Sequence, residues 1–261
     1  MNNSESQTAI EYIASQVKER DYGRYIACLY GPAEKNAAAI ALSALHLELR
    51  QIREKLTEPP LQAIRYQWWG DAIEEALGGS PKAQPLLQLF AAVSDTVSVE
   101  EVISLISARQ HEEPQNFDLE VAIAQSVAPH KAFLNALAQL YCPDNADELA
   151  QACDLGGEIV GLSQLWLGLA GEYHSDKAAT RVRAEIAKHM EAVGQHHAKS
   201  LDDWTGISKS HGKPARMLFL PLWDMMSSLP VDPEEMPDHL KPVSELKWHM
   251  RALQVVLGKS I

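Results

Sequence analysis

Helical periodicity is the feature that most restricts what this chain can fold into. Between Ala38 and Leu56 the apolar residues recur every three or four positions, which traces one buried stripe along a helix. Similar periodicity returns throughout the sequence, and no segment alternates apolar and polar residues between glycine-rich turns as strands do. The sequence therefore predicts an all-α fold.

Proline, glycine and capping residues divide the chain into successive helices. Ser4 can cap a first helix that runs to about Arg20, and Pro32 can open a long second one that Pro59 and Pro60 end. Further helices are expected near 61–77, 85–95, 98–111, 118–141, 155–171, 178–201, 214–228 and 242–257.

The segment 155–171 stands out because Glu158 is its one charged residue. A helix that is apolar on every face belongs inside a bundle. We therefore expect this helix to be the most buried, with Leu162 and Leu165 in the interior.

Length, charge and cysteine content limit the architecture and the partners. A chain of 261 residues can be organised by one hydrophobic core, so a single domain over 1–261 is predicted. The formal net charge of −12 repels the phosphate backbone, which argues against nucleic acid as a partner. The polar N-terminus does not resemble a signal peptide, and no apolar run reaches the roughly 20 residues of a membrane span, although peripheral contact stays open. Three scattered cysteines suit reduced thiols, so a cytoplasmic location is expected.

Six short blocks, in this order, carry a resemblance to a known family. They are DYGRYIA from Asp21, PAEK from Pro32, EPPLQAIRYQWWGDA from Glu58, LISAR from Leu105, LGGEIVGLSQL from Leu155 and ARMLFLPL from Ala215. Taken together, they make the chain resemble the squalene/phytoene synthase family. More narrowly, the chain resembles a divergent branch that includes a mitochondrial complex I assembly factor.

This resemblance implies a class I isoprenoid-synthase-like helical bundle around a central apolar cavity wide enough for prenyl chains. In active members, two aspartate-rich motifs on facing helices hold magnesium, which binds and ionises the substrate diphosphate. Magnesium requires oxygen ligands, and carboxylates four residues apart share one face of a helix.

The positions that match these two motifs have lost most of their carboxylates. Arg50 and Gln51 stand where the first motif has paired aspartates, and Glu54 remains acidic. Arg50 can form an i,i+4 ion pair with Glu54 and would repel a cation. The second motif falls on Leu167 and Gly168 and has become apolar. We therefore expect no metal, no cofactor and no working synthase.

Polar and aromatic residues in the matched blocks are candidates to line a relic pocket. Structural roles compete with this interpretation: Trp69 can be core, Arg65 can be an ordinary surface cation, and a buried Glu158 must be paired or neutralised. The full set is Arg24, Tyr25, Glu48, Arg50, Gln51, Glu54, Arg65, Gln67, Trp69, Arg109, Glu158, Ser163 and Gly168.

The predicted function is therefore that of a non-catalytic homologue that binds a partner protein or a lipid-like, prenyl ligand. Assembly of a respiratory complex is a role suggested by the resemblance alone. The alternative is an active trans-prenyltransferase that condenses prenyl diphosphates and recruits magnesium through Glu48, Glu54, Glu158 or Glu172. A purely structural subunit is a third hypothesis. For ligand binding we expect an apolar cavity between the segments 37–56, 61–77 and 155–171, with Trp166 as a candidate plug.

Overall fold

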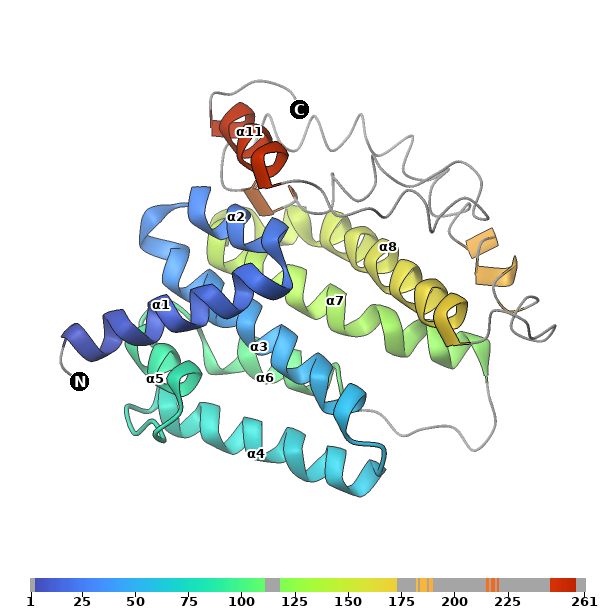
Figure 1. Ribbon diagram of the computed structural model, residues 1–261, viewed down its shortest axis with the longest axis horizontal. Coiled ribbons are helices and arrows are strands. Elements are labelled where there is room, and N and C mark those ends of the chain that lie inside the picture. The colour runs from blue at the N-terminus through green and yellow to red at the C-terminus, as the bar shows by residue number, and fades with distance from the viewer. Residues whose placement is uncertain are drawn as a thin grey trace.

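The computed structural model describes residues 3–110, 118–172 and 245–256, and scattered positions between 182 and 220. Within these residues every regular element is helical, which confirms the all-α prediction (Figure 1). No helix in this part of the chain is long and apolar enough to span a membrane. The single domain over 1–261 stays a prediction.

Nine α-helices are described, eight of them before residue 173. They are α1 (Asn3–Arg20), α2 (Tyr22–Tyr30), α3 (Asn36–Lys55), α4 (Pro59–Leu77), α5 (Pro85–Ala92), α6 (Val99–Ser107), α7 (Leu119–Tyr141), α8 (Ala146–Glu172) and α11 (Glu245–Val256). Two single 3-10 turns, η1 (Ala33–Lys35) and η2 (Pro143–Asn145), precede α3 and α8. The expected helices over 178–201 and 214–228 lie outside the described residues, apart from those scattered positions.

One predicted boundary near the N-terminus is wrong, and one helix was not predicted. Pro32 caps η1 and does not open the long helix, which begins at Asn36. The sequence analysis also missed α2, whose N-cap Asp21 accepts a hydrogen bond from the backbone amide of Arg24 at 2.9 Å. This capping bond compensates for the short length of α2.

The proline pair Pro59–Pro60 begins a helix, whereas the sequence analysis expected it to end one. The preceding helix α3 already ends at Lys55, and Pro59 and Pro60 form the first turn of α4. Proline suits that position because the first amides of a helix have no intrahelical acceptor.

The centre of the described structure is α3, which lies between α1, α5, α6 and α7 (Figure 1). All side chains from Ala38 to Leu47 are buried. By contrast Leu162 of α8 is buried, whereas Leu165 and Glu158 are only partly buried. Among the described residues, the stretch 38–47 of α3 is therefore more enclosed than 155–165, where the sequence analysis expected part of the most buried helix.

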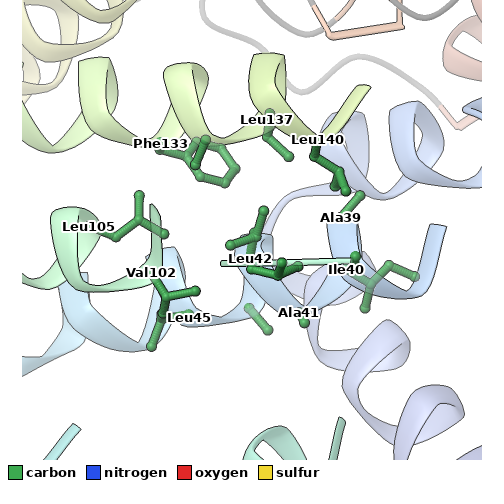
Figure 2. Close-up of a cluster of buried hydrophobic side chains, with 14 of the residues drawn as sticks. Ala39, Ile40, Ala41, Leu42, Leu45, Val102, Leu105, Phe133, Leu137 and Leu140 are labelled. Atoms are coloured by element: carbon green, nitrogen blue, oxygen red, sulfur yellow. The ribbon is translucent and has the colours of Figure 1, made fainter. Parts of the chain in front are cut away.

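Aliphatic side chains from three helices meet around α3. Leu42 and Leu45 of α3 pack near Leu105 of α6 and near Phe133 and Leu137 of α7, and all five are buried (Figure 2). Fully burying a side chain of this size stabilises the fold by roughly 1.5–3 kcal/mol. This cluster fixes the positions of α6 and α7 relative to the middle of α3.

Helices α7 and α8 run side by side with their backbones in close approach (Figure 1). A Cβ atom added to Gly157 would lie 2.6 Å from the backbone nitrogen of Lys131, and one added to Gly161 would lie 2.7 Å from the Cα of Val127. Only glycine leaves room for this contact, so two glycines on one face of α8 determine how closely the helices pack.

The C-terminal helix α11 lies against α2 (Figure 1). The indole of Trp248 occupies the space over Gly23, where an added Cβ would lie 2.6 Å from its Cζ2 atom. The hydroxyls of Tyr22 and Tyr30 each lie 3.1 Å from a ring nitrogen of His249. Packing and polar contacts therefore both hold α11 on α2.

Candidate functional site

The segment that matches the first aspartate-rich motif is the last part of α3, and its polar side chains are engaged with cations. The Nε atom of Arg50 lies 3.1 Å from Oε1 of Glu54, so the predicted i,i+4 ion pair is present. Gln51 accepts a hydrogen bond from the ammonium group of Lys55. These positions do not offer the carboxylate oxygens that magnesium prefers, so the residues do not fit that metal.

The other carboxylates proposed as replacement ligands are also paired. Glu48 lies 2.8 Å from Nη1 of Arg20 on α1, and Glu158 lies 2.9 Å from Nζ of Lys131 on α7. Both Glu158 and Lys131 are only partly buried, so Glu158 is not the deeply buried carboxylate that the sequence suggested. Among the described residues, no group of three or more His, Cys, Asp or Glu side chains could hold a metal ion.

The candidates on α4 take ordinary structural positions. Arg65 is exposed, with its guanidinium carbon 4.5 Å from the ring centre of Trp68. Gln67 is also exposed and donates a hydrogen bond to Asp71 at 2.7 Å. Trp69 is 2% exposed and belongs to the main hydrophobic core.

Two further candidates, Tyr25 and Gly168, lie on α2 and α8. Tyr25 is partly buried, with its ring centre 6.0 Å from that of Tyr22. Gly168 lies within α8, but the contacts of that part of the helix, including the side chains of Trp166, Leu167 and Glu172, lie outside the described residues. The expected apolar cavity stays a prediction.

A pair of buried histidines between α3 and α7 was missed by the sequence analysis. The ring of His46 stacks on Phe133 at 4.3 Å and meets the ring of His130 edge-on at 5.1 Å. His130 Nε2 lies 3.1 Å from the amide oxygen of Gln164 on α8. The guanidinium carbon of Arg24 lies 5.1 Å from the ring centre of Phe133.

These histidines are neutral at physiological pH. Burial, together with the positive charge of Arg109, lowers the pKa of His130 to about 3. Burial and Arg109 likewise hold the pKa of His46 well below its ordinary value, with smaller effects from His130, Arg50 and Arg24. Because His130 is neutral, its Nε2–H can donate to Gln164, and the pair adds no positive charge of its own.

Arg109, which follows α6, is the most unusual polar residue of this region. Its Nε and Nη2 atoms are buried and have no hydrogen-bond partner in the structure. The pKa of Arg109 is lowered to about 10, chiefly by burial, with Arg50 and Arg53 acting in the same direction and Tyr66 and Glu54 in the opposite one. Arg109 remains charged at neutral pH but lies in a setting that disfavours its charge.

Two further buried polar side chains have unsatisfied atoms. Arg24 is 6% exposed and donates from Nη1 to the carbonyl oxygen of Leu218 at 3.1 Å, while its Nε has no hydrogen-bond partner. Ser163 is 2% exposed and its hydroxyl also has none. Leaving a buried donor unsatisfied costs about 1–3 kcal/mol.

The structure thus brings together Arg24, Arg50 and Arg109 from the predicted set with His46 and His130, because all three arginines act on both histidine pKa values. It does not bring Arg65, Gln67 or Trp69 to the same place, as far as the described contacts show. One signal in the sequence could have identified His46: it is a titratable residue inside an uncharged run, 36–47, of the predicted long helix.

The chain was compared with known protein families and solved structures. Residues 17–190 match the family described as squalene/phytoene synthase. The chain belongs to the squalene/phytoene synthase family. The fold of this family member is similar to that of a dehydrosqualene synthase solved in complex with a ligand, with a TM-score of 0.66 over 98% of both chains. The two sequences are 12% identical, so this likeness shows the fold alone.

The family member is also similar to proteins named NADH dehydrogenase (ubiquinone) complex I, assembly factor 6. It is 32% identical to the Bos taurus protein and 31% identical to the Homo sapiens protein, in each case over 83 residues. This match covers 31% of the present chain and a quarter (25%) of each relative. These relatives and the family match confirm the divergent branch suggested by the sequence blocks.

Proposed function

We propose that this chain is a non-catalytic member of the squalene/phytoene synthase family that acts by binding, in the assembly of a respiratory complex. The observation that carries the proposal is the Arg50–Glu54 ion pair, in which Nε and Oε1 lie 3.1 Å apart. It stands where the family holds its first metal-binding aspartates. A cation at this position opposes the magnesium ions on which diphosphate departure depends.

The active-enzyme alternative would need replacement ligands, and the ion pairs argue against it. Glu48, Glu54 and Glu158 each have a cationic partner within 3.1 Å. Using any of them as a magnesium ligand would break that pair. The second-motif positions Leu167 and Gly168 carry no oxygen ligand in their side chains.

The role in assembly is supported by the names of the relatives. Proteins named complex I assembly factor 6 share about a third of their residues with this chain over the matched region. Because that region is a quarter of their length, the role of the whole relative is extended to this chain only as a proposal.

A product assay tests the non-catalytic part of the proposal. The purified chain is incubated with farnesyl or geranylgeranyl diphosphate and magnesium, and extracts are analysed for squalene-like or phytoene-like products. No product above a heat-killed control is expected. Magnesium-dependent product would show that the alternative, an active prenyltransferase, is correct.

Loss of the gene in the source organism tests the assembly part. Membranes of the deletion strain are expected to show reduced NADH dehydrogenase activity and less assembled complex on native gels, both restored by the wild-type gene. Another respiratory enzyme, succinate dehydrogenase, serves as the control and should be unaffected. Unchanged complex I in the deletion strain would contradict the assembly role.

A further inference from the structure

We propose that the start of α4, with the adjoining end of α3, is a surface that docks on an anionic lipid bilayer. Leu61 and Ile64 would enter the boundary between head groups and acyl chains, and Trp68 and the nearby basic side chains would lie among the head groups. This inference goes beyond the proposed function, because it concerns the outer surface of the chain and holds whether or not the chain is catalytic.

The apolar side chains of this surface share one exposed face of α4. Leu61, Ile64 and Trp68 follow one another at steps of three and four residues, which places them on the same side of the helix. Leu61 is 45% exposed and Ile64 is 66% exposed, the largest exposed fraction of any large hydrophobic side chain in the described part of the chain. Helix α4 lies along one edge of the described helices and contacts the core through its other face, with Tyr66 and Trp69 (Figure 1). The exposed face is therefore not needed to hold α4 in place.

The backbone at the start of α4 is also suited to leave water. The first amides of a helix normally have no partner within the helix, and unpaired amides are costly to place among lipids. Pro59 and Pro60 have no amide hydrogen, and the amides of Leu61 and Gln62 both donate to the carbonyl oxygen of Glu58, at 3.0 and 3.1 Å. The first four residues of α4 therefore present no free amide, and both prolines are exposed and apolar.

The charge of this surface differs from that of the whole chain. Between positions 50 and 68 basic residues outnumber acidic ones by four to two, whereas the chain has a net charge of −12. They are Arg50, Arg53, Lys55 and Arg65 against Glu54 and Glu58. Two cations also border the indole of Trp68: the guanidinium carbon of Arg65 lies 4.5 Å and Nζ of Lys82 lies 5.6 Å from its ring centre. Basic side chains beside an apolar face complement the anionic head groups of a bilayer.

The size of the apolar patch favours a bilayer over a second protein as the occupant. A stable protein interface covers about 800 Å² on each partner. Leu61, Ile64 and the partly buried Trp68 supply a small part of such an area, and the same side of α4 continues into Asp71 and Glu75, which are exposed and acidic. Shallow insertion into a bilayer needs only the apolar end of the helix with basic side chains around it.

Flotation of the purified full chain with lipid vesicles tests the surface. The vesicles contain phosphatidylcholine alone, or equal parts of phosphatidylcholine and phosphatidylglycerol. We expect binding to the anionic vesicles that weakens as salt is added, because salt screens surface charge, and at least about tenfold weaker binding to the neutral vesicles. No binding to the anionic vesicles, or equal binding to both kinds, would overturn the proposal.

Matched variants identify the side chains that enter the bilayer. The double variant Leu61→Ser, Ile64→Ser should weaken binding to anionic vesicles by about tenfold or more, because two apolar side chains are lost from the contact. Leu29→Ser on α2 is the control, since Leu29 is 47% exposed and Leu61 is 45% exposed. Lys55→Gln should weaken binding about fivefold, and Lys188→Gln, which removes a lysine that is 71% exposed elsewhere, should not. Equal losses in a variant and its control would contradict the assigned surface.

A fluorescent label separates insertion into the bilayer from association between proteins. The native thiols are buried, so Ile64→Cys can be labelled selectively with a dye that is sensitive to the polarity of its surroundings. Anionic vesicles should shift the emission of this label to the blue and leave that of a label at Leu29→Cys unchanged. Light scattering follows the oligomeric state. A dimer that is lost in Ile64→Ser, with no shift of the label on vesicles, would show that a second copy of the chain covers this face and that the bilayer proposal is wrong.

Discussion

The hydroxyl of Ser126 on α7 donates a hydrogen bond to the carbonyl oxygen of Gly161 on α8 at 2.8 Å. A helix carbonyl normally has its acceptor role filled within its own helix, so this extra bond requires the two backbones to approach closely. Glycine at 161 permits that approach, since an added Cβ would lie 2.7 Å from the Cα of Val127.

Replacing Gly161 by alanine should therefore destabilise the fold. The added methyl meets backbone atoms that cannot move without shifting α7, and overpacking of this kind costs about 1–3 kcal/mol. Urea unfolding followed by circular dichroism measures the change. Gly70→Ala on α4 is the matched control, because its Cβ would lie 3.9 Å from Ile103 and alanine favours the helix by up to about 1 kcal/mol. Equal effects of the two substitutions would contradict the close packing.

The buried histidines should make stability fall at mildly acidic pH. The pKa of His130 is about 3 in the folded protein, below its ordinary value of 6.5, so the unfolded chain binds more protons between these values. The free energy of unfolding is then unaffected above about pH 6.5 and falls by up to about 1.4 kcal/mol per pH unit below it. The His46 pKa shifts in the same direction and adds to the effect.

Urea unfolding at pH 7, 6 and 5 checks this dependence. Carboxylates also titrate in the lower part of this range, so the informative quantity is the difference between the wild type and His130→Gln. The variant should show a shallower loss of stability between pH 6 and 5. Parallel curves for the two proteins would show that His130 is not held neutral by burial.

The three thiols should react slowly in the native protein. Cys28, Cys142 and Cys153 are buried and free, and burial raises the pKa of Cys142 to about 11 and that of Cys153 to about 12. Since the thiolate is the reactive form, few molecules are reactive at pH 8. Ellman's reagent should detect all three thiols at once in guanidinium chloride and almost none in native buffer. Rapid native reaction of a full equivalent would contradict the buried arrangement.

Restoring carboxylates on one side of the family's metal site should not restore catalysis. The double variant Arg50→Asp, Gln51→Asp recreates the acidic positions beside Glu54, but Leu167 and Gly168 still provide no opposing ligand. We expect no product from farnesyl diphosphate and magnesium, with circular dichroism to verify folding. Magnesium-dependent product from this variant would show that one motif is enough and that Arg50 alone blocks the reaction.

The helices were largely predictable because their signals are local. The apolar period of α3 and the stop at Gly78 both depend on neighbours in the sequence. The short helix α2 was not predicted, and its stability depends on the Asp21 cap and on α11. Its contact with α11 joins distant parts of the chain, which no local pattern indicates.

The candidate site was predictable at its motif positions and not in its polar interior. The Arg50–Glu54 pair follows from the spacing of opposite charges on a helix. The proximity of His46 to His130 depends on how α7 packs on α3, and single histidines on apolar faces give no sign of it. Arg109 was a candidate because it ends a matched block, but its unsatisfied edge could be found only from the packed structure.

The contact between α2 and α11 has a consequence for the order in which the chain folds. Tyr22 and His249 are 227 residues apart, so the loop closed by their contact includes most of the protein. Contacts of such long range slow folding, because much chain entropy is lost before they form. During synthesis the buried face of α2, including Ile26, has no α11 to cover it until nearly the whole chain has been made. The nascent chain would therefore expose the apolar face of α2 for longer than a helical bundle whose contacts are mostly local. Aggregation or binding by chaperones would occur at this stage.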